Sequence, residues 1–222
     1  MYQRGGRYMA KSERQKKKEN DRLKRIIDAA YPIFVEKKIE AVGMNEIAEA
    51  AEVGRATLFR CYSSKAELVI AVCSAKWKEY LDELDARRPI SSVGDIPAID
   101  RFIFTMDSFI DMYQNHKDLL QFNDNFNHYV THEGCDNEQF LGFHTSLTSA
   151  DTRFDMMYEK AREDHTLRTD IPMEEFMRVT VHTMLTACTY YASGFVWGSS
   201  DNKDYTPELL RIKEMLVNYV KC

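Results

Sequence analysis

Apolar residues recur along this chain with the spacing of amphipathic helices. The first such pattern includes Leu23, Ile26 and Phe34, and it predicts a helix over roughly residues 20–37. Pro32 lies inside that stretch, where a proline removes a backbone hydrogen bond. We therefore expect a kink in this helix near Pro32.

The same spacing continues through most of the remaining chain. It recurs in the segments 96–110, 119–129 and 173–197. No stretch alternates strictly between apolar and polar residues, and no Asn-Gly or Asp-Gly hairpin signal occurs, so strands are not expected. Proline and glycine breaks between the helical patterns leave about nine helices. The sequence predicts an all-α protein.

Residues 42–68 predict two short helices joined by a tight turn. Met44 and Ile47 begin the first helix, the turn falls at 52–54, and the second helix runs from Arg55 to Tyr62. Small alanines allow the two helices to cross closely, which is typical of a helix-turn-helix that reads the DNA major groove. Two glycines stand at the helix starts. Gly54 is expected to cap the second helix, where its amide can approach a phosphate, and Gly43 the first.

Charge divides the chain into a basic first part and an acidic second part. The net charge is +6 through Lys65 and −11 from Ala66 onward, although the whole chain carries only −5. A basic head on an acidic body is typical of a DNA-binding module joined to a domain that does not bind DNA. Residues 1–19 form a basic arm that we expect to be disordered, and such an arm can still contact phosphates. The predicted domains are therefore 1–19, 20–65 and 66–222.

Several other classes of protein are not expected. The five cysteines are odd in number, scattered and never in a C-x-x-C pair, so neither a disulfide framework nor a zinc ribbon is indicated. The chain shows no long apolar run and no signal-peptide pattern, so we expect a cytoplasmic protein without a membrane partner. Nucleotide-binding and hydrolase motifs are also missing. We expect neither an enzyme nor a cofactor.

One weak pattern for metal binding is present. His128 and His132 lie at i, i+4, with Asp124 one turn earlier and Cys135 just beyond. Histidines often recur at this spacing by chance, so metal binding stays a minor alternative. Cys61 lies beside Arg60 in the basic head, which can favour a reactive thiolate, but a packed and inert thiol is the expected state.

The first part of the chain also resembles a known family. The segment IIDAAYPIFVEKKIEAVGMNEIAEAAEVGRATLFRCYSSKAELVIAV is similar to the N-terminal signature of the TetR family, the tetracycline-repressor-like regulators. The resemblance is one ungapped run that includes three helices and the entry into a fourth. It implies an all-α homodimer with a variable C-terminal ligand domain. It also implies a palindromic operator on double-stranded DNA, read by two recognition helices.

The resemblance places DNA contacts on particular residues. Arg55, Thr57 and Arg60 correspond to the groove-facing side of the recognition helix, and Arg55 is our choice for base readout, with an ordinary phosphate contact as its alternative. Lys65 corresponds to a lysine that touches phosphate. The chain departs from the family at Gly43, Phe59 and Cys61, where serine or threonine, tyrosine, and histidine or tyrosine are common. The predicted DNA-binding residues are Gly43, Gly54, Arg55, Thr57, Phe59, Arg60, Tyr62 and Lys65.

Residues 66–222 are predicted to hold a small-molecule effector. The segments 96–131 and 140–158 are rich in aromatic and sulfur side chains, which suit a cavity for a mostly apolar ligand, although such residues also fill ordinary cores. The predicted ligand-binding residues are Phe102, Met106, Phe109, Tyr113, Phe122, Asn123, Phe126, Phe143, His144 and Tyr158.

The last two helices are the expected dimer interface. In proteins that this chain resembles, the corresponding helices form a four-helix bundle with their symmetry mates, and small residues near 186–194 permit close approach. Packing within one subunit is an equal alternative for each residue. The predicted interface residues are Ala187, Ala192, Gly194, Leu209, Ile212, Met215 and Leu216.

Three functional hypotheses follow. The first is a repressor released from its operator when an effector shifts the fourth helix and changes the separation of the two DNA-binding heads. The second is a DNA-binding protein of the same fold that is controlled by a protein partner or acts as an activator. The third is a helical enzyme or metal-binding protein, which would require turnover or stoichiometric metal.

Overall fold

The protein is helical throughout the residues that its computed structural model describes, which are 5–87, 96–133, 148–194 and 203–222. Within them the only strand-like pairing is a single bridge between Leu167 and Lys221. The all-α prediction is therefore confirmed. None of the described helices is long and apolar enough to cross a membrane.

Three helices and a connecting turn form the N-terminal head. They are α1 (Gly5–Glu36), the short 3-10 turn η1 (Ile39–Ala41), α2 (Met44–Ala50) and α3 (Arg55–Cys61). Helix α1 begins earlier than predicted, so it includes most of the basic segment expected to be an arm. It also continues past Pro32 to Glu36 as one helix.

The turn between α2 and α3 follows the sequence prediction. Glu52 adopts a positive φ of 52°, and the amide of Val53 donates to the carbonyl of Ala48 at 2.9 Å, which closes the end of α2. Gly54 then caps α3 through its carbonyl, which accepts from the amides of Thr57 and Leu58. Leu58 itself is fully buried. The turn thus fixes the angle between α2 and α3.

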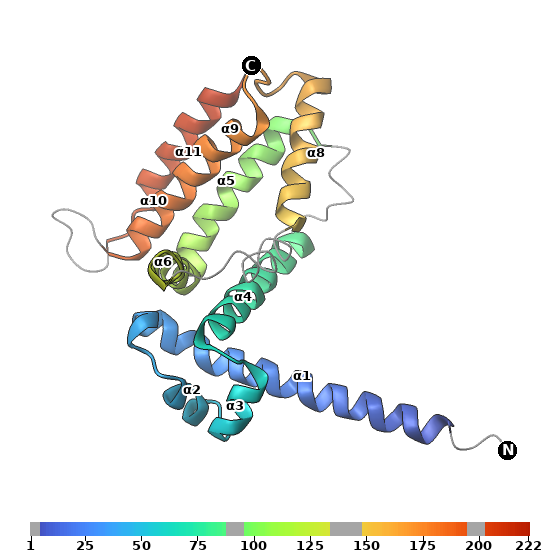
Figure 1. Ribbon diagram of the computed structural model, residues 1–222. Helices are drawn as coiled ribbons and strands as arrows, with labels where there is room; N and C mark the ends of the chain where they lie inside the picture. Colours follow the sequence, from blue (N-terminus) through green and yellow to red (C-terminus); the bar gives the residue numbers. More distant parts are fainter. Residues whose placement is uncertain (1–4, 88–95, 134–147, 195–202) are drawn as a thin grey trace.

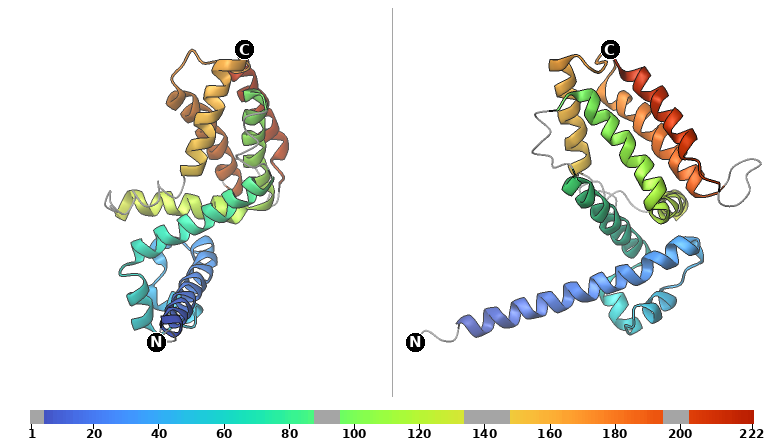
Figure 2. Two further views of the ribbon diagram at one scale, coloured as in Figure 1. Left: turned by 90° about the vertical axis from the view of Figure 1, so that its right-hand side faces the viewer. Right: turned by 180° about the vertical axis from the view of Figure 1, so that it is seen from behind.

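The body is formed by the remaining helices, which pack into one bundle. They are α4 (Lys65–Arg87), α5 (Ala98–Asn115), α6 (Lys117–Glu133), α8 (Thr148–Asp164), α9 (Met173–Met177), α10 (Thr183–Ala192) and α11 (Thr206–Val220). Helices α5, α10 and α11 lie side by side, with α8 next to α5 (Figure 1). Helix α4 leads from the head into this bundle, and α6 crosses between head and body (Figure 2).

A π-helical turn interrupts the long helix predicted after Pro172. Residues Arg178–His182 form this turn between α9 and α10. The hydroxyl of Thr180, which is fully buried, donates to the carbonyl of Phe176 at 2.8 Å. Because π-turns shift the side chains that follow them, the turn changes the face that α10 presents to the body.

Two clusters of buried side chains hold the molecule together. The larger lies within the body, among α5, α8, α10 and α11. The other centres on the head and includes Ile26, Phe34 and Leu58 together with Phe122 and Phe126 of α6. The second cluster therefore extends across the boundary between head and body.

Candidate DNA-binding surface and effector cavity

Helix α3 presents charged and aromatic side chains outward. Arg55 and Arg60 are exposed, Phe59 is 39% exposed, and Thr57 is half-buried. The Arg55 guanidinium carbon lies 5.6 Å from the centre of the Phe59 ring, a cation–π contact that steadies the arginine without using its hydrogen-bond donors. These donors remain available to base edges or phosphates.

The two glycines of the head are not required by packing. A Cβ added at Gly43 would meet no atom within 4 Å, and at Gly54 the nearest atom would be the Thr57 hydroxyl at 3.9 Å. Their backbones are extended, with negative φ angles. What glycine provides at both positions is an uncovered amide at a helix start.

Tyr62 and Lys65 face the protein more than the solvent. Tyr62 is buried, and burial raises the pKa of its hydroxyl to about 12. The Lys65 ammonium donates to the carbonyls of Glu40 at 3.1 Å and Val42 at 3.0 Å, and it lies 5.5 Å from the centre of the Tyr129 ring on α6. Lys65 therefore links the η1 turn, the start of α4 and α6. The predicted phosphate contact of this lysine stays a prediction.

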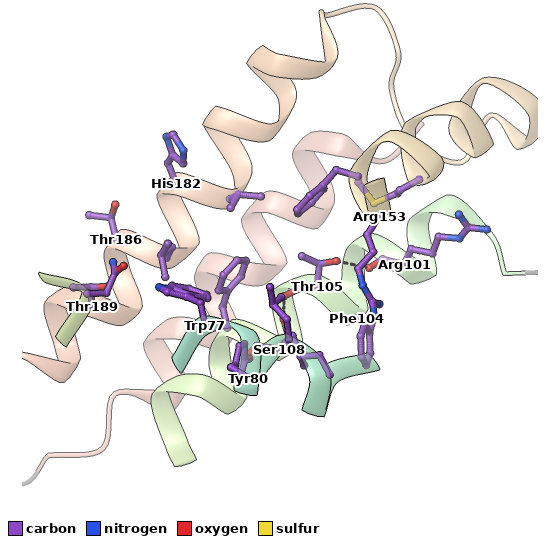
Figure 3. Close-up of a pocket in the computed structure, with 18 of the residues that line it drawn as sticks. Trp77, Tyr80, Arg101, Phe104, Thr105, Ser108, Arg153, His182, Thr186 and Thr189 are labelled. Atoms are coloured by element: carbon purple, nitrogen blue, oxygen red, sulfur yellow. Dashed lines mark hydrogen bonds between the residues drawn. The ribbon is translucent and has the colours of Figure 1, made fainter. Parts of the chain in front are cut away.

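A cavity of about 600 Å³ lies in the body between α4, α5, α6, α8 and α10 (Figure 3). Its volume is in the range of small-molecule sites. Apolar side chains from four helices form most of its walls, among them Leu81, Phe109, Phe154 and Leu185. Of the predicted ligand-binding residues, Phe109 and Asn123 line it.

The other predicted ligand-binding residues lie elsewhere. Phe102 and Tyr158 each pack against Phe176 with ring centres 5.7 Å apart. Met106 is fully buried, and the Tyr113 hydroxyl accepts from the amide of Tyr205 at 3.1 Å. These four side chains fill the core of the body. Two further aromatic side chains, Phe122 and Phe126, belong to the head cluster. Phe143 and His144 lie outside the described residues.

The sequence prediction does not include the walls from α4 and α10, and on α8 it names Tyr158 in place of Arg153 and Phe154. Trp77, Arg153 and Thr189 line the cavity from these three helices. These three helices are less amphipathic than α5, so their apolar spacing gives little sign of which side chains line a cavity. The small residues of α10 are predicted to lie in a dimer interface or to pack within one subunit, and neither prediction includes a cavity wall.

Polar groups stand at several points around the cavity. Arg153 forms an ion pair with Asp85 at the end of α4. The indole N–H of Trp77 is buried and has no hydrogen-bond partner in the described part of the chain. Arg101 turns away from the other labelled side chains (Figure 3), and its guanidinium donates to the carbonyls of Ile96 and Met156. Burial lowers the pKa of Arg101.

Helix α6 contacts both the cavity and the head. Asn123, Asp124 and Asn127 line the cavity. On the head side, the Tyr31 hydroxyl donates to the Asp118 carboxylate at 3.0 Å, and the Asn125 side-chain amide donates to the carbonyl of Phe34 at 3.0 Å. Burial and the nearby Asp118 charge raise the pKa of Tyr31 well above its usual value. One face of α6 therefore lines the cavity, and another face contacts the head.

Phe122 reinforces this junction from within. Its ring lies 5.4 Å from the ring of Tyr31 and 6.4 Å from that of Phe34, measured between centres. All three rings come from helices on either side of the boundary. Because such cores are close-packed, a displacement of α6 is transmitted to the end of α1.

The outer faces of α10 and α11 expose large apolar side chains. Tyr190, Leu210 and Tyr219 are each at least 40% exposed, and Met215 is 70% exposed. Of the predicted interface residues, Met215 and Gly194 are exposed, whereas Ala187 and Ile212 are half-buried. The other three, Ala192, Leu209 and Leu216, are buried within their own subunit.

The described residues at the candidate metal and thiol positions do not form a metal-binding cluster. His128 and His132 are exposed with ring centres 4.4 Å apart, and His128 lies 4.0 Å from the Glu40 carboxylate. No group of three potential ligands occurs among the described residues, and Cys135 is not one of them. Cys61, the candidate thiol, is a free cysteine and half-buried.

Comparison with known proteins agrees with this geometry. Residues 26–72 match the model of the family described as bacterial regulatory proteins, tetR family. A stretch of 96 residues is 33% identical to the HTH-type transcriptional repressor KstR of Mycobacterium tuberculosis, covering 43% of this chain and 42% of that protein. The matched stretch therefore spans about two fifths of that curated relative.

Solved structures show that the likeness in fold extends over the body. The fatty acid degradation regulator FadR from Bacillus halodurans superposes with a TM-score of 0.65 at 15% identity, over 88% of this chain and 94% of that one. FadR from Bacillus subtilis, solved with stearoyl-CoA, gives a TM-score of 0.61 at 15% identity, over 87% and 96%. Residues 26–72 are thus similar to the DNA-binding part of tetR-family bacterial regulatory proteins, and the body shares the fold of solved regulators of this kind.

Proposed function

We propose that the protein is a homodimeric transcription regulator that binds a palindromic DNA operator and is released from it by a small, mostly apolar effector. The head of residues 20–65 reads DNA, and residues 66–222 hold the effector and the dimer interface. One observation carries this proposal. Helix α6 lines the cavity with Asn123 and Asp124 and is hydrogen-bonded to the head through Asp118 and Asn125.

The coupling follows from differential binding. An effector that fits the cavity better when α6 and α4 are displaced stabilises that arrangement. The displacement moves Tyr31 and Phe34 of α1, which α6 holds by the contacts described above. Since both recognition helices of a dimer must reach successive turns of the major groove, a change in the separation of the heads lowers operator affinity.

The DNA side of the proposal is tested by selection. Purified protein is used to select fragments from genomic DNA, and Arg55→Ala is then compared with Arg162→Ala, an exposed arginine on α8. We expect a palindromic site to be enriched. For Arg55→Ala we expect the preference for that site over a scrambled duplex to fall by about 5- to 150-fold, because a bidentate contact to guanine contributes about 1–3 kcal/mol.

Arg162→Ala should keep the preference of the wild type, since it removes the same charge far from the head. If no site is enriched, or if both variants behave alike, α3 does not read sequence through Arg55.

The effector side is tested by filling the cavity. Acyl-coenzyme A thioesters of increasing chain length, up to stearoyl-CoA, are the first class to screen, because the walls are mostly apolar and the B. subtilis FadR binds such a molecule. A ligand at 100 times its Kd stabilises the fold by about 2.7 kcal/mol, so a rise in Tm is expected for the wild type. Leu185→Trp should abolish this rise.

Ala86→Trp is the matched control, because it adds the same indole at an exposed position of α4 that does not line the cavity. Equal stabilisation of Leu185→Trp and Ala86→Trp would place the binding site outside this cavity.

The dimer is tested on the exposed face of α11. In a two-fold symmetric interface each substitution appears twice, so Met215→Glu introduces two unpaired charges into the apolar contact. We expect sedimentation to show a dimer for the wild type and a shift to monomer for Met215→Glu. Met156→Glu, the same substitution at an exposed position of α8, should remain dimeric. A dimeric Met215→Glu protein would argue for another interface.

A further inference from the structure

The N-terminal half of α1 extends beyond the rest of the head. Helix α1 has 32 residues, so it is about 48 Å long at 1.5 Å per residue. Its N-terminal part projects away from the other helices, at the end of the molecule that holds α2 and α3 and opposite the C-terminus (Figures 1 and 2). Every side chain from Glu13 to Asp21 is exposed.

Basic residues form a stripe along this helix. Arg14, Lys18, Arg22 and Arg25 recur at i, i+4, i+8 and i+11, which places them on one face. None of the four forms an ion pair with a carboxylate in the described part of the chain. By contrast, Lys24 is held by Asp28 at 3.1 Å and lies 3.8 Å from Glu79. Among the residues that the structure describes, no carboxylate therefore lies within ion-pair distance of the stripe.

The first part of the stripe is not stabilised by tertiary packing, and it contains like charges one turn apart. Residues 13–21 include no apolar side chain, so this part of α1 gains nothing from tertiary packing. The pairs Arg14–Lys18 and Lys18–Arg22 place like charges one turn apart, which destabilises a helix by a few tenths of a kcal/mol each. Glu19 and Asp21 lie one turn from Arg22 and Arg25 and offset part of this repulsion, and a partner with regularly spaced negative charges would offset the rest.

We propose that the basic stripe of Arg14, Lys18, Arg22 and Arg25 binds the phosphate backbone of DNA flanking the site read by α3. This inference rests on the proposed DNA-binding function and extends its footprint. The segment 5–22 is about 27 Å long, which corresponds to roughly eight base pairs of duplex. These contacts add affinity and salt dependence without adding sequence preference.

The chemistry of the segment favours DNA over a membrane surface. Helices that lie on anionic membranes combine basic residues with an apolar face that enters the lipid. Between Glu13 and Asp21 no apolar residue is available for such a face. Duplex DNA requires only positive charge at suitable spacing, and the stripe offers it at the same end of the molecule as α3.

The test compares two duplexes and two variants. One duplex holds only the site recovered by selection with the full chain, and the other carries about ten additional base pairs of arbitrary sequence on each side. Dissociation constants are measured at several salt concentrations for the wild type and for R14Q/K18Q. K78Q/K221Q is the matched control, with the same change in charge at exposed positions far from the N-terminal half of α1.

We expect the wild type to bind the longer duplex more tightly, with a steeper dependence of log Kd on log salt. For R14Q/K18Q the slope on the longer duplex should fall by about 0.9 for each phosphate contact removed, while binding to the short duplex changes little. K78Q/K221Q should behave as the wild type on both duplexes.

Two results would overturn the inference while leaving the proposed function intact. One is a wild type that binds both duplexes with equal affinity and equal salt slope. The other is an R14Q/K18Q variant that keeps the gain from flanking DNA but loses binding to vesicles of anionic lipid. If the wild type enriches no site at all, the proposed DNA-binding function fails, and this inference fails with it.

Discussion

The packing of α6 against the end of α1 connects the two halves of the molecule. Phe122 places its ring against Tyr31 and Phe34, and hydrogen bonds to Asp118 and from Asn125 flank this contact. Lys65 adds a third connection, because its ammonium holds the η1 carbonyls and lies against Tyr129. A head joined to the body only through α4 would be free to turn, whereas these contacts define its orientation.

In the proposed function, this junction couples the cavity to α3. Asn123 and Phe122 are neighbours on α6, yet one lines the cavity and the other packs on the head. A ligand that moves the helix by a small amount must repack both sides, since closely packed interiors change between discrete arrangements. The exposed Arg55 and Arg60 are carried along with the head without contacting the ligand.

The sequence predicted the head better than the body for a physical reason. The turn at Glu52–Gly54 and the exposed Arg55 depend on local backbone preferences and on a recognisable motif, and both lie in the short segment that matches the tetR family. The cavity depends on where several helices diverge. Phe102 and Phe109 have the same spacing on α5, but the first is fully buried in the core and the second lines the cavity. Periodicity cannot separate these two environments.

The central claim is that occupation of the cavity and binding of DNA are coupled through α6, and coupling of this kind must be reciprocal. The direct measurement is the affinity of the effector for the free protein and for the operator complex, in the wild type and in Tyr31→Phe, which removes the hydrogen bond to Asp118. The account predicts that operator DNA weakens effector binding by about 5- to 150-fold in the wild type, and by a smaller factor in Tyr31→Phe. Equal effector affinity with and without operator would contradict it.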